Sequence, residues 1–379
     1  MGVRLGSEAA LFNCPNRLRK SLNRNSFTAD STKHKPLSKI MSTAIHALAA
    51  SGAKQPLKPF QFDPGPLGSE QAEIAVESCG ICHSDLSMLD NDWGMTKYPF
   101  VPGHEIVGKI VALGEHTKRL KIGDRVGLGW YSASCGECEQ CLSGNQNLCL
   151  KAEATIIGRH GGFATRVRAQ WTWVSPLPAK IDAGKAGPLL CGGITVFNPI
   201  VQCGIKPTDS VAVIGIGGLG HMALKFLRAW GCDVTAFTTS DSKRDEALRL
   251  GAHRTLNSRN ADELAKAAGS FDFILNTTNA DLDWNTYIAA LKPKGRLHTV
   301  GAVPSPMAMI AFPMILGQKS LSASPLGSPA TTDTMLAFSA RHGIAPTTET
   351  FPMSRANDAL EHLRSGNARY RVVLTNDLA

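Results

Sequence analysis

The sequence predicts an α/β protein in which a doubly wound parallel sheet forms one domain and shorter strands form a second, β-rich domain. Between residues 196 and 330, apolar strand-like runs alternate with helical patterns, which is typical of a parallel sheet with right-handed crossovers. A glycine-rich turn joins the first of those strands to the first helix. Between residues 41 and 195, short β-like runs are separated by Gly and Pro turns, which favours an antiparallel module.

Residues 1–40 form a basic extension that we expect to be disordered. They contain eight Lys and Arg against two acidic residues, so they carry +6 of the net charge of +9. The rest of the chain carries +3 and therefore requires no nucleic-acid-binding surface. The extension has no apolar run of a secretory signal, which leaves a tail without targeting function or an organelle transit peptide. We expect a cytoplasmic protein, with organelle import by residues 1–40 as the alternative.

The β-rich part begins with expected strands at residues 72–76, 106–113 and 125–129. It also contains Cys135, Cys138, Cys141 and Cys149 in the spacing C-x2-C-x2-C-x7-C. Four thiolates close the shell of one tetrahedral zinc ion and leave no position for a substrate, so this spacing predicts a structural site. Reduced surface thiols or two disulfides are the alternatives, but cysteines two residues apart strain a disulfide.

A second set of potential ligands is spread over the same part of the chain. Cys82, His104 and Cys191 offer two thiolates and one imidazole, and Glu105 could occupy the fourth position in a resting state. Mixed ligands with one exchangeable position are typical of a catalytic zinc. Asp85 is placed to hydrogen-bond a ligating histidine. The alternative for His104 is an ordinary hydrogen-bonded structural histidine.

The parallel-sheet part opens with the apolar run 211–214, which suits a buried parallel strand. A G-x-G-x-x-G turn follows at once, and a helical pattern then runs to Trp230. This context predicts that the turn binds a pyrophosphate through its backbone and the helix N-terminus. The residues expected to contact it are Gly215, Gly217, Gly218, Leu219 and Gly220.

The remaining elements follow in order. We expect strands at 234–237, 271–276 and 295–302, a helix over 242–251, tail helices over 331–342 and 356–365, and a last strand at 370–374. The uncharged stretch 297–318 contains three prolines, so we interpret it as strand and loop and expect no membrane association. The chain therefore divides into four parts: 1–40, 41–195, 196–330 and 331–379.

Five motifs in order, CGICHSDL, PFVPGHEIVG, the four-cysteine lobe, LLCGGITVFNP and VIGIGGLGH, resemble the zinc-dependent medium-chain alcohol dehydrogenases. Within that family the chain is most similar to cinnamyl-alcohol-dehydrogenase-like, NADP-dependent aldehyde reductases. The resemblance runs from about Met41 to the C-terminus. It implies a Rossmann domain, a GroES-like catalytic domain with two zinc ions per chain, a tail at 331–379 that returns to the catalytic domain, an active cleft between the domains, and a homodimer.

The coenzyme can be argued from the second strand of the parallel sheet. NAD enzymes carry an acidic residue at the end of this strand for the ribose hydroxyls. Here Thr239 and Ser240 stand there, followed by Lys243 and Arg244, which can hold a 2′-phosphate. Asp241 is an objection, and the two basic residues could simply be the solvated face of a helix. We expect NADP(H).

The resemblance also implies roles beside the metal. Ser84 matches the hydroxyl that bonds the substrate oxygen and starts a proton relay, and His83 is expected to contact coenzyme phosphate or ribose. Relatives often have a histidine where this chain has Ser87. Water or the coenzyme ribose would then complete the relay.

The expected substrate is a small aldehyde or primary alcohol. Trp93 and Trp130, with Tyr131 and Pro304, are candidate walls of an apolar pocket, or ordinary core residues. An NAD-dependent polyol dehydrogenase, a zinc-ribbon nucleic-acid-binding protein and a zinc-free reductase are the alternatives. A polyol dehydrogenase would carry an acidic residue after the second strand of the parallel sheet, and this chain has none there. A zinc-ribbon protein would have no use for the glycine-rich turn. A zinc-free reductase would lack the metal ligands that this chain has.

Overall fold

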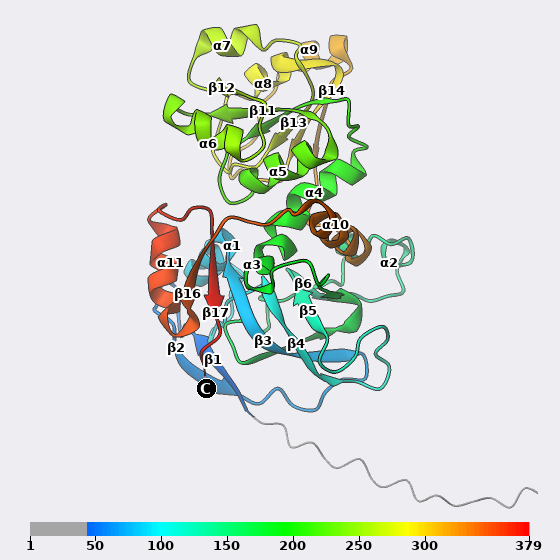
Figure 1. Ribbon diagram of the computed structural model, residues 1–379, viewed down its shortest axis with the longest axis vertical. Coiled ribbons are helices and arrows are strands. Elements are labelled where there is room, and N and C mark those ends of the chain that lie inside the picture. The colour runs from blue at the N-terminus through cyan, green and yellow to red at the C-terminus, as the bar shows by residue number, and fades with distance from the viewer. Residues whose placement is uncertain (1–43, 379) are drawn as a thin grey trace, which may run out of the picture. The chain divides into compact units, whose positions relative to one another are not determined.

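The computed structural model describes residues 44–378. The basic extension predicted for residues 1–40 lies outside the described residues, so its two interpretations remain predictions. Two larger sheets and two small ones organise the described part of the chain (Figure 1).

The first large sheet is parallel and doubly wound, as the alternation of strands and helices predicts. Its order is β12-β11-β10-β13-β14-β15, and every neighbouring pair in it is parallel. The chain moves outward from β10 in one direction and then from β13 in the other, so the strand order reverses between these two. Its strands are β10 Ser210–Ile214, β11 Asp233–Thr238, β12 Arg254–Asn257, β13 Phe271–Asn276, β14 Leu291–Thr299 and β15 Ser320–Ala323.

Helices pack on both faces of this sheet. Phe226 of α5 shares one apolar core with Val213 of β10, whereas Trp284 of α8 shares another with Ile214 of the same strand. Successive side chains of a strand point to opposite faces, so these two cores lie on opposite sides. The helices are α4 Gly192–Gln202, α5 Gly220–Trp230, α6 Arg244–Arg249, α7 Ala261–Lys266, α8 Trp284–Ala290, α9 Ala311–Gly317 and α10 Pro329–His342.

The second large sheet is β-rich and carries its own core. Its order is β16-β17-β3-β4-β5-β9, with β8 also paired to β3. The last strand, β17, lies antiparallel beside β3, so the end of the chain joins the sheet built by its first half (Figure 1). The strands are β3 Gln71–Ile81, β4 Ile106–Leu113, β5 Arg125–Leu128, β8 Arg166–Gln170, β9 Val174–Pro176, β16 Thr348–Pro352 and β17 Arg371–Thr375.

Short elements complete the fold. The two small sheets pair β1 Ile45–Ala49 with β2 Lys58–Phe62, and β6 Tyr131–Ala133 with β7 Glu153–Ala154. The remaining α-helices are α1 His83–Asp90, α2 Glu139–Leu142, α3 Ala183–Ala186 and α11 Ala356–Arg364. The 3-10 helices are η1 Gln146–Leu148, η2 Trp171–Trp173, η3 Gly187–Leu190, η4 Asp241–Lys243 and η5 Met353–Arg355.

Two expectations of local structure, for the stretch 297–318 and for the helix over 242–251, were wrong. The stretch 297–318 contains helix α9, because Pro313 falls in the first turn, where backbone N–H groups have no helical partner in any case. The helix expected over 242–251 is divided into η4 and the shorter α6. The antiparallel module expected within residues 41–195 is confirmed, because its described strand pairs are all antiparallel, and the parallel pair of β16 and β17 comes from the tail of the chain.

None of the helices within residues 44–378 combines the length and the apolar composition that crossing a bilayer requires. The four-part division of the chain made from the sequence stays a prediction.

Candidate active site

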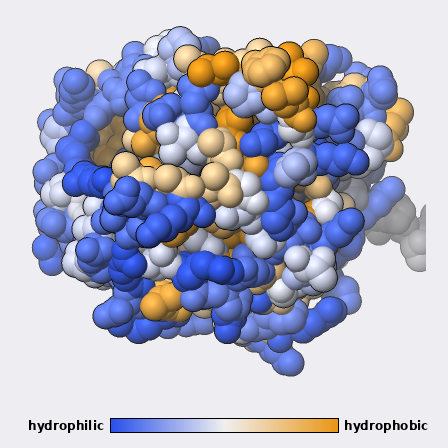
Figure 2. All heavy atoms as spheres, turned by 90° about the horizontal axis from the view of Figure 1, so that it is seen from above, coloured by the Kyte–Doolittle hydropathy of each residue, from blue (hydrophilic) through white to orange (hydrophobic). Residues whose placement is uncertain are grey.

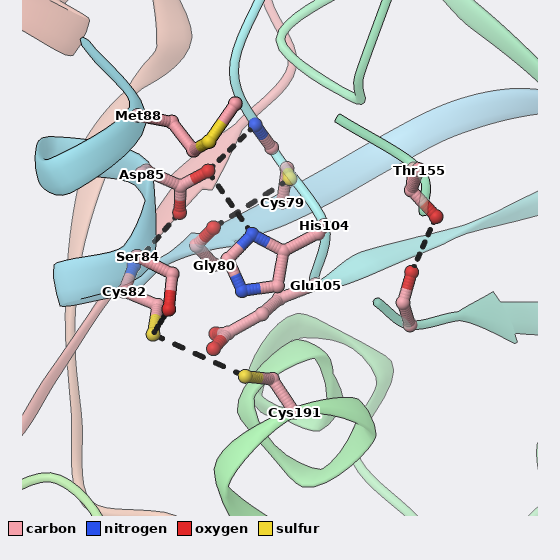
Figure 3. Close-up of polar contacts among 12 residues, drawn as sticks. Cys79, Gly80, Cys82, Ser84, Asp85, Met88, His104, Glu105, Thr155 and Cys191 are labelled. Carbon is pink, nitrogen blue, oxygen red and sulfur yellow. Dashed lines mark hydrogen bonds and ion pairs between the residues drawn. The ribbon is translucent and has the colours of Figure 1, made fainter. Parts of the chain in front are cut away.

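Four buried side chains from three distant segments of the chain converge (Figure 3). They are Cys82 after β3, His104 and Glu105 before β4, and Cys191 before α4. Their potential ligand atoms all lie within 4.8 Å of one another, and the sulfur atoms of Cys82 and Cys191 are 3.9 Å apart. The structure therefore brings together all four residues that the sequence suggested for an open metal shell.

Asp85 organises this cluster through both oxygens of its buried carboxylate. Oδ1 lies 3.1 Å from His104 Nδ1 and accepts the N–H of Gly103 at 2.9 Å. Oδ2 accepts the N–H of Cys82 at 3.0 Å. An ionised carboxylate only accepts hydrogen bonds, so Nδ1 of His104 carries a hydrogen and Nε2 is the ring nitrogen left to face the cluster. The expected hydrogen bond between Asp85 and a histidine of the cluster is present.

Two atoms of the cluster are buried without a hydrogen-bond partner among the described residues. These atoms are His104 Nε2 and Glu105 Oε2. A buried polar atom that lacks a partner costs about 1–3 kcal/mol. Two such atoms beside two sulfur atoms form a donor set that suits Zn2+, which prefers sulfur, imidazole nitrogen and carboxylate oxygen.

The two cysteines of the cluster differ in acidity. The hydrogen bond from Cys191, opposed by burial, is the largest cause that lowers the pKa of Cys82 well below its ordinary value. The same hydrogen bond, with burial, raises the pKa of Cys191. Burial lowers the pKa of His104, but Asp85 and Cys82 outweigh it and raise that pKa. The sulfur of Cys82 is therefore the one that favours the negatively charged thiolate, which would stabilise a bound cation.

Arg371 is a residue of this site that the sequence analysis missed. It opens β17, is buried, and forms an ion pair with the carboxylate of Glu105. Burial raises the pKa of Glu105, and Arg371 opposes that shift. An arginine inside the otherwise apolar strand RVVLT was the available signal, because charged residues are rarely buried without a partner.

Aromatic and hydroxyl groups surround the cluster. The rings of His104 and Trp130 meet edge to face at 4.9 Å, and Trp93 meets Trp130 at 6.2 Å. Ser84 places its hydroxyl oxygen 3.7 Å from the sulfur of Cys82. Tyr131 packs instead on Trp173, at 5.1 Å. The two tryptophans and Ser84 therefore lie beside the cluster, whereas Tyr131 of β6 packs against η2.

The four-cysteine lobe forms a second cluster of potential ligands. The sulfur atoms of Cys135, Cys138, Cys141 and Cys149 lie within 4.8 Å of one another. The lobe contains the short helices α2 and η1, and its leucines Leu142, Leu148 and Leu150 are exposed. The lobe therefore has almost no apolar core of its own, as its sequence indicates.

The glycine-rich turn lies between β10 and α5, as predicted. Gly215 has a φ of +86°, and a Cβ on Gly220 would meet the Gly215 oxygen at 1.9 Å, so both positions require glycine. Gly217 and Gly218 line a cavity of about 200 Å³, to which His83, Lys243 and Arg371 also contribute. Four basic side chains, those of His83, Lys243, Arg369 and Arg371, thus line one cavity with the turn, together with the acidic Glu246.

The end of β11 carries the other residues expected to bind the coenzyme. Thr239 and Ser240 follow this strand, with Lys243 at the cavity. Arg244 is engaged elsewhere, because its guanidinium bonds Asp241 and Glu263 at 2.7 Å each. The pairing compensates the charge of Asp241, which was the objection to a phosphate site here.

Comparison with known families assigns both parts of the chain. Residues 68–179 match the alcohol dehydrogenase GroES-like domain, and residues 218–341 match the zinc-binding dehydrogenase family. Aldehyde reductase AdhA of Synechocystis sp. is 55% identical, and the match covers 88% of this chain and 99% of that protein.

The chain belongs to the zinc-dependent medium-chain alcohol dehydrogenases.

Further relatives place this dehydrogenase in the cinnamyl-alcohol-dehydrogenase-like group. Cinnamyl alcohol dehydrogenase 7 of Arabidopsis thaliana is 37% identical, with 89% of this chain and 97% of the relative covered. Mannitol dehydrogenase of Petroselinum crispum is 39% identical, with 84% and 97% covered. This dehydrogenase is accordingly an oxidoreductase of alcohols and aldehydes, as the resemblance implied.

Solved structures confirm the fold. Cinnamyl alcohol dehydrogenase SbCAD4 of Sorghum bicolor superposes with a TM-score of 0.84 at 37% identity, covering 88% of this chain and 98% of that one. CAD of Helicobacter pylori in complex with NADP(H) gives 0.81 at 28% identity, covering 88% and 99%. The predicted combination of a Rossmann domain and a GroES-like domain is therefore confirmed.

Proposed function

We propose that this dehydrogenase reduces aldehydes with NADPH at a zinc site formed by Cys82, His104 and Cys191. The main support for this proposal is that these side chains converge with Glu105, next to a basic cavity that includes the glycine-rich turn. Both unpartnered atoms of the cluster fit a cation, and its sulfur and nitrogen donors fit Zn2+. Glu105 has one oxygen at the cluster and one bound to Arg371, so it can act as an exchangeable fourth ligand.

The chain's own residues supply orientation and proton transfer. Zn2+ bound there supplies a Lewis acid, and NADPH supplies a hydride for the carbonyl carbon. Asp85 fixes the ring of His104 so that Nε2 faces the cluster. The Ser84 hydroxyl, beside Cys82, holds the substrate oxygen and passes it a proton as the aldehyde becomes an alcohol. Ser87 leaves the end of this relay to water or to the coenzyme ribose.

Trp130 and Trp93 support an apolar substrate pocket over this site. Trp130 covers the edge of His104, and Trp93 is 40% exposed, so its ring can contact a ligand. Such walls exclude water from the reacting atoms and accept many aldehydes, because one methylene changes discrimination by only about 1–3 kcal/mol. The relative named an aldehyde reductase supports reduction as the main direction.

NADPH is supported by the residues after β11. Thr239, Ser240 and Lys243 offer two hydroxyls and an ammonium group to a 2′-phosphate, and no acidic residue stands at the end of the strand. Arg244 contributes indirectly, by holding Asp241. The pyrophosphate would lie at Gly217, Gly218 and Leu219, beside His83. The complex of the Helicobacter pylori relative with NADP(H) agrees with this assignment.

A second zinc ion in the lobe of Cys135, Cys138, Cys141 and Cys149 would be structural. Its shell is closed by four sulfur ligands, and the exposed leucines leave the metal as the main support of the lobe. We also propose that the chain divides into a catalytic domain at residues 41–195, a coenzyme-binding domain at 196–330 and a tail at 331–379.

A homodimer is supported by the open edge of the parallel sheet. β15 is the last strand of its sheet, and α9 before it exposes apolar side chains (Figure 2). The exposed fractions are 65% for Phe312, 69% for Ile315 and 72% for Leu316 of this helix, and 60% for Ile310, the residue before it. An unpaired edge beside an apolar patch is a typical site of association. Analytical ultracentrifugation should find a dimer, and Phe312→Lys with Ile315→Lys should make it monomeric.

The direct test combines two assays on the purified full chain. Elemental analysis should find two Zn2+ per chain, and NADPH should be oxidised when benzaldehyde or a similar aldehyde is added. Turnover with a chain that contains no zinc, or zinc without any NADPH oxidation across a panel of aldehydes, would refute the proposal. The kcat/KM values over that panel then rank the substrates.

A further inference from the structure

His221 contacts three separate segments with one imidazole ring. It follows the glycine-rich turn at the start of α5 and is fully buried. Nδ1 lies 3.0 Å from the carbonyl oxygen of Gly217, within the turn. Nε2 lies 3.2 Å from the backbone nitrogen of Thr347, and the ring stacks on Tyr370 with centroids 4.8 Å apart and planes 12° apart. The turn, the approach to β16 and the residue before β17 therefore meet at this side chain.

The partners of His221 define its hydrogen position. An amide N–H can only donate, so Nε2 accepts from Thr347 and carries no hydrogen. Nδ1 then carries the hydrogen and donates it to the Gly217 oxygen. Burial is the largest cause that lowers the pKa of His221, to about 3, and Lys225 and Arg371 add to it. The ring is therefore neutral at physiological pH, with both nitrogen atoms in use.

Lys225 reinforces the same arrangement one helical turn later. Its ammonium group donates to the oxygen of Ala345 at 2.8 Å and to the hydroxyl of Thr347 at 3.2 Å. Residues four apart share one face of a helix, so His221 and Lys225 both bind the segment Ala345–Thr347 that crosses α5. The backbone carbonyl oxygen of Thr347 in turn accepts hydrogen bonds from the backbone N–H groups of Tyr370 and Arg371, each at 3.1 Å.

This arrangement fixes the glycine-rich turn against the start of β17. Tyr370 and Arg371 line the same cavity as Gly217 and Gly218. A Cβ on Gly218 would lie only 3.0 Å from Nη1 of Arg371, so the arginine reaches the turn. The Tyr370 side chain also interacts with Glu246 of α6. The width of the cavity between turn and arginine thus depends on the contacts of His221.

We propose that His221 is a positioning residue of the coenzyme site. Its contacts hold the amides of the Gly217–Gly218 turn and the guanidinium of Arg371 at the spacing that a pyrophosphate needs. This inference rests on the proposed binding of NADPH in that cavity. His221 itself need not touch the coenzyme, because the glycine-rich turn lies between them. Loss of its contacts should weaken coenzyme binding and leave the aldehyde site largely unchanged.

Three variants separate the contacts of the ring. His221→Leu removes both hydrogen bonds and the aromatic stacking, His221→Phe keeps the stacking on Tyr370, and His221→Gln keeps a polar side chain for Gly217 or Thr347. His342→Leu is the matched control, because His342 is an exposed histidine on α10 that packs on Phe338 at 4.2 Å. The experiment measures the Kd of NADPH by fluorescence titration, and kcat with separate KM values for coenzyme and aldehyde.

We expect His221→Leu to raise the Kd and KM of NADPH about tenfold, with the aldehyde KM and kcat changed less than twofold, and the control to match the wild type. His221→Gln should recover part of the affinity, which also tests the inference if the leucine variant does not fold. A leucine or glutamine variant that folds and binds NADPH within twofold of the wild type would overturn it, as would equal losses in both KM values. A wild-type chain that binds no nicotinamide nucleotide would instead refute the proposed function itself.

Discussion

Arg371 of β17 forms a buried ion pair with Glu105, which lies beside His104 in the metal-binding cluster. The exposed fractions of the two side chains are 5% for Arg371 and 0% for Glu105. The last strand of the chain therefore supplies a charge to a site whose other parts come from its first half. This pairing explains how a carboxylate can be buried next to thiolates.

Arg371→Met should destabilise the protein strongly, because it leaves the Glu105 carboxylate buried without its partner. Loss of one member of a buried pair costs about 3–5 kcal/mol. The double variant Arg371→Met with Glu105→Gln removes the unpaired charge and should recover part of this loss. Chemical denaturation of the wild type, both single variants and the double variant measures the coupling. Additive losses in the double variant would show that the ion pair has no energetic role.

Cys138→Ser should remove one zinc ion and loosen the lobe around it. Metal binding there takes the place of an apolar core, so we expect a lower Tm and protease cleavage within residues 135–149. Cys203→Ser is the control, since Cys203 lies outside both clusters. A melting curve unchanged in spite of one zinc fewer would argue against a structural metal.

Local patterns predicted the site better than long-range ones. The spacing of Cys135 to Cys149 and the turn from Gly215 to Gly220 encode their own geometry, so both could be interpreted without a structure. Cys82, His104 and Cys191 are far apart in the sequence, so they could be grouped only by the ligand chemistry of a catalytic zinc and by the resemblance to a family. The partners of Arg371 and His221 depend on how β17 pairs with β3 and how the segment before β16 crosses α5, and no local pattern shows which residues meet there. Helix α9 was missed because its proline lies in the first turn.

The wild type should prefer NADPH over NADH by about a hundredfold or more. Charge-assisted hydrogen bonds from Lys243, with the hydroxyls of Thr239 and Ser240, are each worth about 1.5–3 kcal/mol. Ser240→Asp with Lys243→Ala should repel the 2′-phosphate and offer an acceptor to ribose hydroxyls. The ratio of kcat/KM for the two coenzymes, at fixed salt, measures the change. A wild type that prefers NADH, or a ratio unmoved by the double change, would contradict the assignment.

Acid should weaken the fold through His298. Burial, aided by Arg296, lowers its pKa to about 4, and its nitrogen atoms lie 2.8 and 2.9 Å from the hydroxyls of Ser322 and Ser324. The unfolded chain takes up this proton near pH 6.5, whereas the folded chain does so only near pH 4. The contribution to stability is therefore present above pH 6.5 and is lost as the pH falls from 6.5 to 4, by up to about 1.4 kcal/mol per pH unit.

His298→Leu should remove this dependence whatever its effect on absolute stability. The free energy of unfolding of both proteins, measured at several pH values between 4 and 7, gives the two slopes. Parallel slopes would mean that His298 takes up its proton equally in the folded and unfolded states.

The proposed zinc site at Cys82, His104 and Cys191 is tested most directly by metal depletion and return. Chelation should abolish the oxidation of NADPH by an aldehyde, and added Zn2+ should restore it in proportion to the zinc regained at this site. Cys82→Ser, with the four-cysteine lobe still loaded, should remain inactive at every zinc concentration. The account would be contradicted if the wild type kept its turnover after losing zinc from this cluster, or if Cys82→Ser kept at least half of the wild-type turnover.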